Sequence, residues 1–307
     1  ALMLCSDDKH PDDLMEGHIN KLVIRALKKG YALFDVLYAA CIQPIDHYGL
    51  EVGALQPGDP ADFIRVENLR DFTLNDVFID GKQVLHSSQL LFDRKTTVYP
   101  TRMHSTPIRP EQIQVRAKEA YIRLIVAHDG ELISSSSIER CSINAQQEAL
   151  SDPHRDILKI VVFNRYWNSA PSVAFIKGFG LKSGAMASSV AHDCHNIIAV
   201  GVEDEDISQA INAIIQAKGG ISFVNKEERK TLALPVAGMM SAEPGDEVAR
   251  QYKWLDQMAK EAGSSLSAPF MTLSFMALLV IPSLKISDKG LFDGEEFQFV
   301  DLFVKKA

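Results

Sequence analysis

The feature that most constrains the fold of this 307-residue chain is an apolar run at its start, Leu2 to Cys5, that leads directly into Ser6-Asp7-Asp8. An uninterrupted apolar run is typical of a strand buried on both faces, as in a parallel sheet. The residues that follow the two carboxylates indicate the start of a helix. In a (β/α)8 barrel the C-terminal end of a strand is where catalytic groups lie, so Asp7 is a candidate ligand for a divalent metal and a candidate carrier of protons. The alternative is a polar turn in which an Asp caps the next helix.

Length and composition limit the remaining possibilities. A chain of this length predicts about two domains. The net charge of −8 argues against nucleic acid as a partner, because binding phosphates needs a basic surface. We find no run of about 18 apolar residues, and therefore expect no membrane span. The four cysteines show no Cys-x-x-Cys spacing, which favours reduced thiols in a cytoplasmic protein over a disulfide framework.

The pattern changes along the chain and predicts three regions. Residues 1–48 contain two amphipathic helices, at about 19–27 and at 33–41, the second ending before Pro44. Residues 49–98 read as short strands and turns, with a strand at 62–66 and a hairpin over 77–85. The Asp80-Gly81 dipeptide is a strong turn signal for that hairpin.

Residues 99–307 read as a self-contained α/β unit, reached through a proline-containing connector at about 92–110. We expect a hairpin in which 120–127 and 131–134 flank His128-Asp129-Gly130. The further expected elements are buried strands at 157–163, 197–202 and 232–237, and amphipathic helices at 206–217 and 246–262.

A second candidate site is the block His192-Asp193-Cys194-His195-Asn196. It follows a run of small residues, Gly184 to Ser189, and such a run allows a ligand or another chain segment to approach the backbone closely. Titratable groups just before a buried strand are often functional. The alternative is a polar turn whose histidines satisfy backbone groups, since a His-x-x-His pair alone has little specificity as a metal motif.

Four blocks, in order along nearly the whole chain, resemble one family. They are Cys5 to His18, Gly53 to Asp62, Gly180 to Asn196, and Pro282 to Leu291. The resemblance is to the bacterial adenine deaminases of the amidohydrolase superfamily, and the third block resembles adenine deaminases in particular. For the fold, the resemblance implies the end of a (β/α)8 barrel over 1–48, part of a small β-sandwich over 49–98, and a C-terminal α/β domain over 99–307.

The resemblance also implies a function. The family removes ammonia from adenine hydrolytically, using a binuclear centre of a divalent metal, Mn²⁺ or Fe²⁺. Asp7 would be a metal ligand and accept the proton of the attacking water, and Asp8 would be a catalytic neighbour that contacts the substrate. His192, Asp193 and His195 would bind the purine, in a domain that covers the mouth of the barrel.

The chain lacks the His-x-His pair that the family uses on its first barrel strand. We therefore expect a C-terminal fragment that needs an N-terminal half as its partner and is inactive alone, and we expect a homo-oligomer. Two alternatives remain. One is an amidohydrolase acting on another cyclic amidine or amide. The other is a non-catalytic ligand-binding or assembly module.

Overall fold

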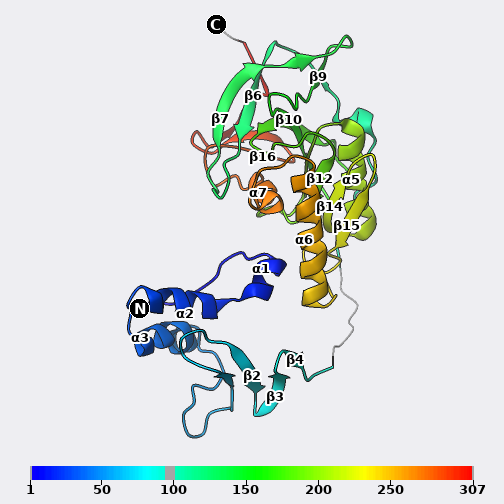
Figure 1. The fold of residues 1–307 in the computed structure, drawn as a ribbon. Helices are drawn as coiled ribbons and strands as arrows, with labels where there is room; N and C mark the ends of the chain where they lie inside the picture. Colours follow the sequence, from blue (N-terminus) through cyan, green and yellow to red (C-terminus); the bar gives the residue numbers. More distant parts are fainter. Residues whose placement is uncertain (1, 94–100, 306–307) are drawn as a thin grey trace. The chain divides into compact units, whose positions relative to one another are not determined.

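The computed structural model describes residues 2–93 and 101–305. The chain divides into two compact units, Ala1–Thr96 and Thr97–Ala307, shown in Figure 1 and described separately below. The predicted domain boundaries at 48 and 98 stay predictions. Part of the predicted connector, residues 94–100, lies outside the described residues.

The first unit combines short helices with a small sheet (Figure 1, blue to cyan). A core forms where Val23 of one helix, Val36 of another and Phe72 of a loop are buried together. The helical elements are α1 Pro11–Glu16, α2 Ile19–Lys28, α3 Leu33–Leu37, the π-helical turn Tyr38–Ile42, and α4 Gln43–Tyr48. The antiparallel sheet has the order β1 (Phe63–Val66), β2 (Leu74–Ile79), β3 (Lys82–His86), β4 (Gln89–Leu90).

Two expectations for the first unit are wrong. Leu2–Cys5 form no strand with any residue that the structure describes; Leu4 N–H instead donates to the Ala39 carbonyl at 3.2 Å. A strand exists only through pairing with a neighbour, and an apolar run cannot report whether that neighbour is present. The helix expected to end before Pro44 continues instead: the π-helical turn Tyr38–Ile42 leads without a break into α4, whose first turn contains Pro44.

The second unit is built on one large sheet. Within the described residues this sheet has nine strands in the order β15-β14-β12-β13-β10-β11-β6-β19, with β7 paired to β6. Neighbours are antiparallel except for the parallel pair of β11 and β6. The strands are β6 Tyr121–Val126, β7 Ser135–Arg140, β10 Leu158–Phe163, β11 Ser172–Lys177, β12 Ala185–Ser188, β13 Ile197–Gly201, β14 Gly220–Val224, β15 Arg229–Ala233 and β19 Phe303–Val304.

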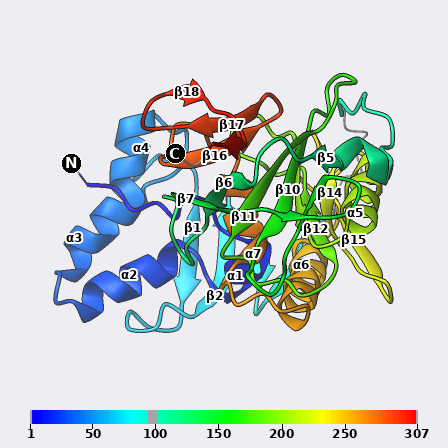
Figure 2. The ribbon, with the colours of Figure 1, turned by 90° about the horizontal axis from the view of Figure 1, so that it is seen from above.

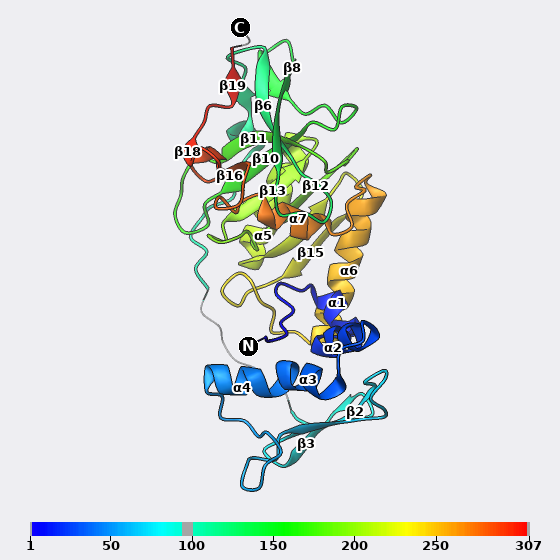
Figure 3. The ribbon, with the colours of Figure 1, turned by 90° about the vertical axis from the view of Figure 1, so that its left-hand side faces the viewer.

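Helices cover both faces of this sheet, as Figures 2 and 3 show. Helix α5 (Asp204–Ala217) packs on one face, and its apolar residues share a buried cluster with Val161 and Phe163 of β10. Helices α6 (Gly245–Glu261) and α7 (Pro269–Phe275) pack on the other face, in a second buried cluster that includes Ile160 and Val162 of the same strand. The alternation along β10 therefore divides the core into two apolar layers, giving a three-layer α/β/α unit.

Smaller elements complete the second unit. They are the 3₁₀ turn Pro110–Ile113, the sheet of β5 Val115–Arg116, β9 Glu148–Leu150 and β8 Ser142–Ile143, and the sheet of β16 Leu284–Ser287, β17 Gly290–Asp293 and β18 Gln298–Phe299. None of the described helices is both long and apolar enough to cross a membrane.

The expected strands at 157–163 and 197–202 and the two long helices are confirmed within a few residues, and two strand positions are wrong. The strand that pairs with β6 begins at Ser135, not at Glu131. The strand expected over 232–237 lies earlier, at Arg229–Ala233, because Pro235 has no N–H to give to a sheet. β15 is an edge strand, and its Arg229 and Lys230 are residues that edges commonly carry.

Candidate functional site

The predicted site residues fall into two groups, each in its own unit. Asp7 and Asp8 are adjacent in the first unit. His192, Asp193 and His195 lie together in the second unit, on the connection between β12 and β13. The geometry of each group is given separately.

Asp7 occupies an exposed turn ahead of α1. Its φ of 52° lies in the left-handed region, which Asp tolerates better than most residues. Its Oδ1 accepts the backbone N–H of Asp8 at 2.8 Å, so the turn is fixed by the carboxylate itself. Next to it, the Ser6 hydroxyl and His18 Nε2 are 2.6 Å apart, which ties this turn to the start of α2.

The alternative in which Asp7 or Asp8 caps the next helix is not supported. Helix α1 begins after His10, and that residue makes no side-chain capping hydrogen bond. The Asp7 and Asp8 residues are both exposed. Asp7 is therefore available to a ligand, while the His18 ring contacts the Ser6 hydroxyl.

A metal centre needs several converging ligands. Within residues 2–93 and 101–305, no three His, Cys, Asp or Glu side chains lie close enough to hold a metal ion together. Asp7 can supply one carboxylate ligand, but the described part of this chain does not complete a divalent metal site.

The second group lies at the edge of the large sheet where β12 ends and β13 begins. The His192 ring stacks on Phe275 with centroids 4.8 Å apart and planes at 16°, and it meets the His195 ring edge-on at 5.6 Å. Its backbone N–H donates to the Ser274 carbonyl at 3.1 Å. The His192 side chain is 17% exposed and that of Asp193 79% exposed, with His192 Nδ1 and Asp193 Oδ1 3.8 Å apart. This group presents an aromatic surface beside a solvent-accessible carboxylate.

The small-residue run before His192 has a structural explanation. Ala185 and Ala187 lie in the core beneath α5, and Met186 lies in the core beneath α6 and α7. A Cβ on Gly201 would come within 2.5 Å of the Ala185 Cβ. The close approach that these small residues allow is therefore that of helices and neighbouring strands.

Two residues that the sequence pattern does not identify support the histidine block. The Tyr166 hydroxyl donates to the Cys194 carbonyl at 2.9 Å, and Arg165 Nη2 donates to that hydroxyl at 3.0 Å. Arg165 is 3% exposed, and its Nε and Nη1 have no hydrogen-bond partner among the described residues. A buried guanidinium is uncommon, and the only sequence signal for it is its position two residues after the buried strand β10.

Comparison with known proteins gives one family match in each of the two units. Residues 1–84 match the amidohydrolase family, and residues 131–298 match the adenine deaminase C-terminal domain. Relatives named adenine deaminase include those of Salinibacter ruber, 48% identical over 99% of this chain, Sulfurovum sp., 52% over 98%, and Methanosarcina acetivorans, 46% over 100%. The chain covers 56%, 55% and 57% of these relatives, respectively, and so spans about half of their length.

Proposed function

This chain belongs to the family of the adenine deaminase C-terminal domain, and on that basis we propose that it is the C-terminal portion of an enzyme that hydrolyses adenine to hypoxanthine and ammonia. The observation that carries the proposal is the order of the matches, with an amidohydrolase segment followed by the adenine deaminase domain. Relatives of that name match along nearly the whole chain, which supports adenine as the substrate.

We assign the chemistry of this chain to Asp7. In hydrolytic deamination a water adds to C6 of the purine, and its proton must reach the departing amine. Asp7 takes that proton and returns it to the leaving nitrogen, which is the work of a general base and then a general acid. The exposed carboxylate, fixed by the Asp8 N–H, supports this role. Asp8 is its neighbour on the substrate side.

The family also supports a divalent metal, whose chemistry is to lower the pKa of a bound water. We propose a binuclear centre of Mn²⁺ or Fe²⁺ for the complete enzyme, with Asp7 as a ligand from this chain. The remaining ligands belong to the N-terminal half of the enzyme. That half supplies most of the amidohydrolase barrel, and this chain supplies its end. We further propose that the enzyme is a cytoplasmic homo-oligomer active in purine salvage.

We propose that His192, Asp193 and His195 bind the purine. The stacked His192 and Phe275 rings support this role, because aromatic faces bind planar heterocycles well. The exposed Asp193 can accept hydrogen bonds from the N–H groups of a purine. The buried Arg165 and the half-buried Tyr166 support the backbone of this block through the hydrogen bond to the Cys194 carbonyl.

The test is Asp7→Asn in the full-length enzyme, with adenine as substrate. We expect kcat to fall by about a hundredfold or more, the usual effect of losing a general acid–base group. The matched control is Asp13→Asn, which removes an exposed carboxylate in α1 and should leave kcat within about twofold. An unchanged kcat in the Asp7 variant would favour a non-catalytic module. Turnover of a cyclic amide such as dihydroorotate in place of adenine would favour another amidohydrolase activity.

A further inference from the structure

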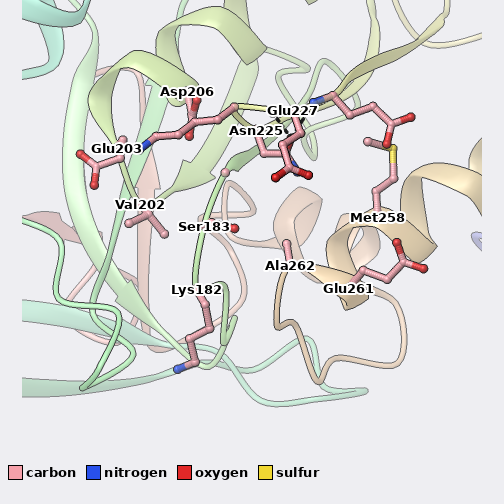
Figure 4. A pocket seen from close by; sticks show the side chains of 13 residues that line it. Lys182, Ser183, Val202, Glu203, Asp206, Asn225, Glu227, Met258, Glu261 and Ala262 are labelled. Carbon is pink, nitrogen blue, oxygen red and sulfur yellow. Dashed lines mark hydrogen bonds between the residues drawn. The ribbon is translucent and has the colours of Figure 1, made fainter.

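The second unit contains a cleft of about 530 Å³ that the proposed deamination does not use (Figure 4). It lies between the start of α5, the turn between β14 and β15, and the end of α6. Its size is that of a small-molecule site. Two lysines and five carboxylates line it, the carboxylates being Glu203, Asp206, Glu227, Glu228 and Glu261.

Asp206 is the residue that points to a ligand. It is 7% exposed, yet it has no hydrogen bond, and no cation within 4.0 Å, among the residues that the structure describes. Burial and the Glu203 carboxylate raise its pKa, and the cations of Lys226 and Arg229 offset this only in part. Burying a carboxylate that accepts no hydrogen bond is unfavourable, and the start of α5 and the two nearby cations compensate for the lost hydration only in part. A ligand that donates hydrogen bonds into the cleft would supply what Asp206 lacks.

The spacing of the carboxylates argues for an organic cation over a metal ion. Figure 4 shows Glu203 and Asp206 on one side of the cleft and Glu261 on the other, with Glu227 between them. No three ligand side chains converge on one point anywhere in the described chain, so these carboxylates cannot enclose a divalent ion.

Apolar surface separates the acidic groups, since Val202, Met258 and Ala262 also line the cleft. Of the two lining lysines, Lys182 donates its Nζ to the Pro153 carbonyl at 2.9 Å. A linear polyamine has the matching chemistry, with ammonium groups separated by short methylene chains. Its ammonium groups can meet separate carboxylates while the methylene groups contact the Met258 and Val202 side chains.

We propose that this cleft is a binding site for a linear polyamine, with one ammonium group held by Asp206 and the others by the carboxylates of the β14–β15 turn and the end of α6. The site takes an organic cation whose length spans from α5 to α6. Its occupancy neutralises the Asp206 carboxylate on the wall of the cleft and therefore stabilises the second unit.

Isothermal titration calorimetry of this chain with spermidine tests the proposal. We expect one saturable site that weakens as salt is raised from about 50 to 300 mM. The variant Asp206→Asn keeps the shape of the side chain and removes its charge, and should weaken binding by about tenfold or more. The matched control is Glu205→Gln, which removes an exposed charge from the same helical turn outside the cleft and should change affinity by less than about twofold.

Three results would overturn the proposal. They are no saturable spermidine binding, an equal loss of affinity in both variants, and displacement of spermidine by Mg²⁺ beyond that caused by NaCl of equal ionic strength. Circular dichroism shows whether the Asp206 variant folds. If it does not, the exposed rim carboxylates provide the test through Glu227→Gln combined with Glu261→Gln. Unchanged affinity in that double variant contradicts the proposed site.

Discussion

Replacing Lys285 by methionine should stabilise the second unit at neutral pH. Lys285 lies on β16, is fully buried, and donates its Nζ to the Leu132 carbonyl at 2.7 Å. Among the described residues no carboxylate lies within ion-pair distance of it. Burial lowers the pKa of Lys285 from 10.5 to about 8. This drop corresponds to a cost of about 3 kcal/mol for keeping the ammonium in the folded chain.

The sign of the pH dependence follows from that shift. Below about pH 8 the lysine is protonated in both the folded and the unfolded chain, so the folded state bears the full cost. Between about pH 8 and 10.5 the folded chain releases the proton while the unfolded chain keeps it. Since the unfolded state then binds more protons, the free energy of unfolding rises with pH. Lys285→Met removes this titration, and the sulfur-containing chain fills similar space.

Urea unfolding followed by tryptophan fluorescence measures the effect. Both tryptophans, Trp167 and Trp254, belong to the second unit, so the signal reports on the unit that contains Lys285. At about pH 7 we expect the variant to be more stable by about 2 kcal/mol, after allowing for the lost hydrogen bond to Leu132. The gap should close by about pH 10. The exposed Lys289→Met is the control and should change stability by less than about 0.5 kcal/mol. A gap that stays constant with pH would refute the reasoning.

Three further predictions concern other parts of the second unit. Gly238→Ala should destabilise the second unit by about 2 kcal/mol or more in urea unfolding, because φ of Gly238 is 76° and the new Cβ would lie 1.8 Å from Arg165 Nη1. A variant as stable as the wild type would be inconsistent with this packing. Lys159 is buried and paired with Asp204, so Asp204→Asn should cost about 3–5 kcal/mol in the same assay, and adding Lys159→Met should recover much of the loss. No recovery would mean that the pair is not the cause. Asp193→Asn in the full-length enzyme should lower kcat/KM for adenine by about tenfold with an unchanged Tm, and full activity would remove Asp193 from the site.

Local signals explain the parts of the fold that the sequence predicts correctly. The Asp80-Gly81 turn joins β2 and β3 with φ of 49° and 73°, the left-handed values that this dipeptide favours. Helices α5 and α6 follow from apolar residues at helical spacing, because one side of each helix packs on the sheet. These features depend on residues close together in the chain.

The errors arise where long-range pairing decides the structure. An apolar run such as Leu2–Cys5 becomes a strand only when another segment lies beside it, and the described chain offers none. In β15, pairing with β14 selects Arg229–Ala233, although Leu234 and Val236 have more suitable side chains for a strand. Hydrophobicity alone does not fix such a register.

The candidate site was predictable only in part. Sequence identifies the titratable block at His192, since charged groups before a buried strand are unusual. It cannot identify Phe275 or Arg165, which come from segments about 80 residues later and 30 residues earlier and meet the block only in the folded chain. The small-residue run before the block serves helix packing, a purpose that the sequence pattern does not distinguish from ligand approach.

The most direct measurement of the central proposal is the formation of hypoxanthine from adenine by this chain, with Mn²⁺ present, alone and after addition of a separately expressed N-terminal half. We predict no product from the chain alone and turnover once the N-terminal half is added, because the described residues supply Asp7 but no complete metal site. Turnover by the chain alone would contradict the need for a partner. No turnover from the combined halves, under conditions in which the intact enzyme is active, would contradict the assignment of this chain to the reaction.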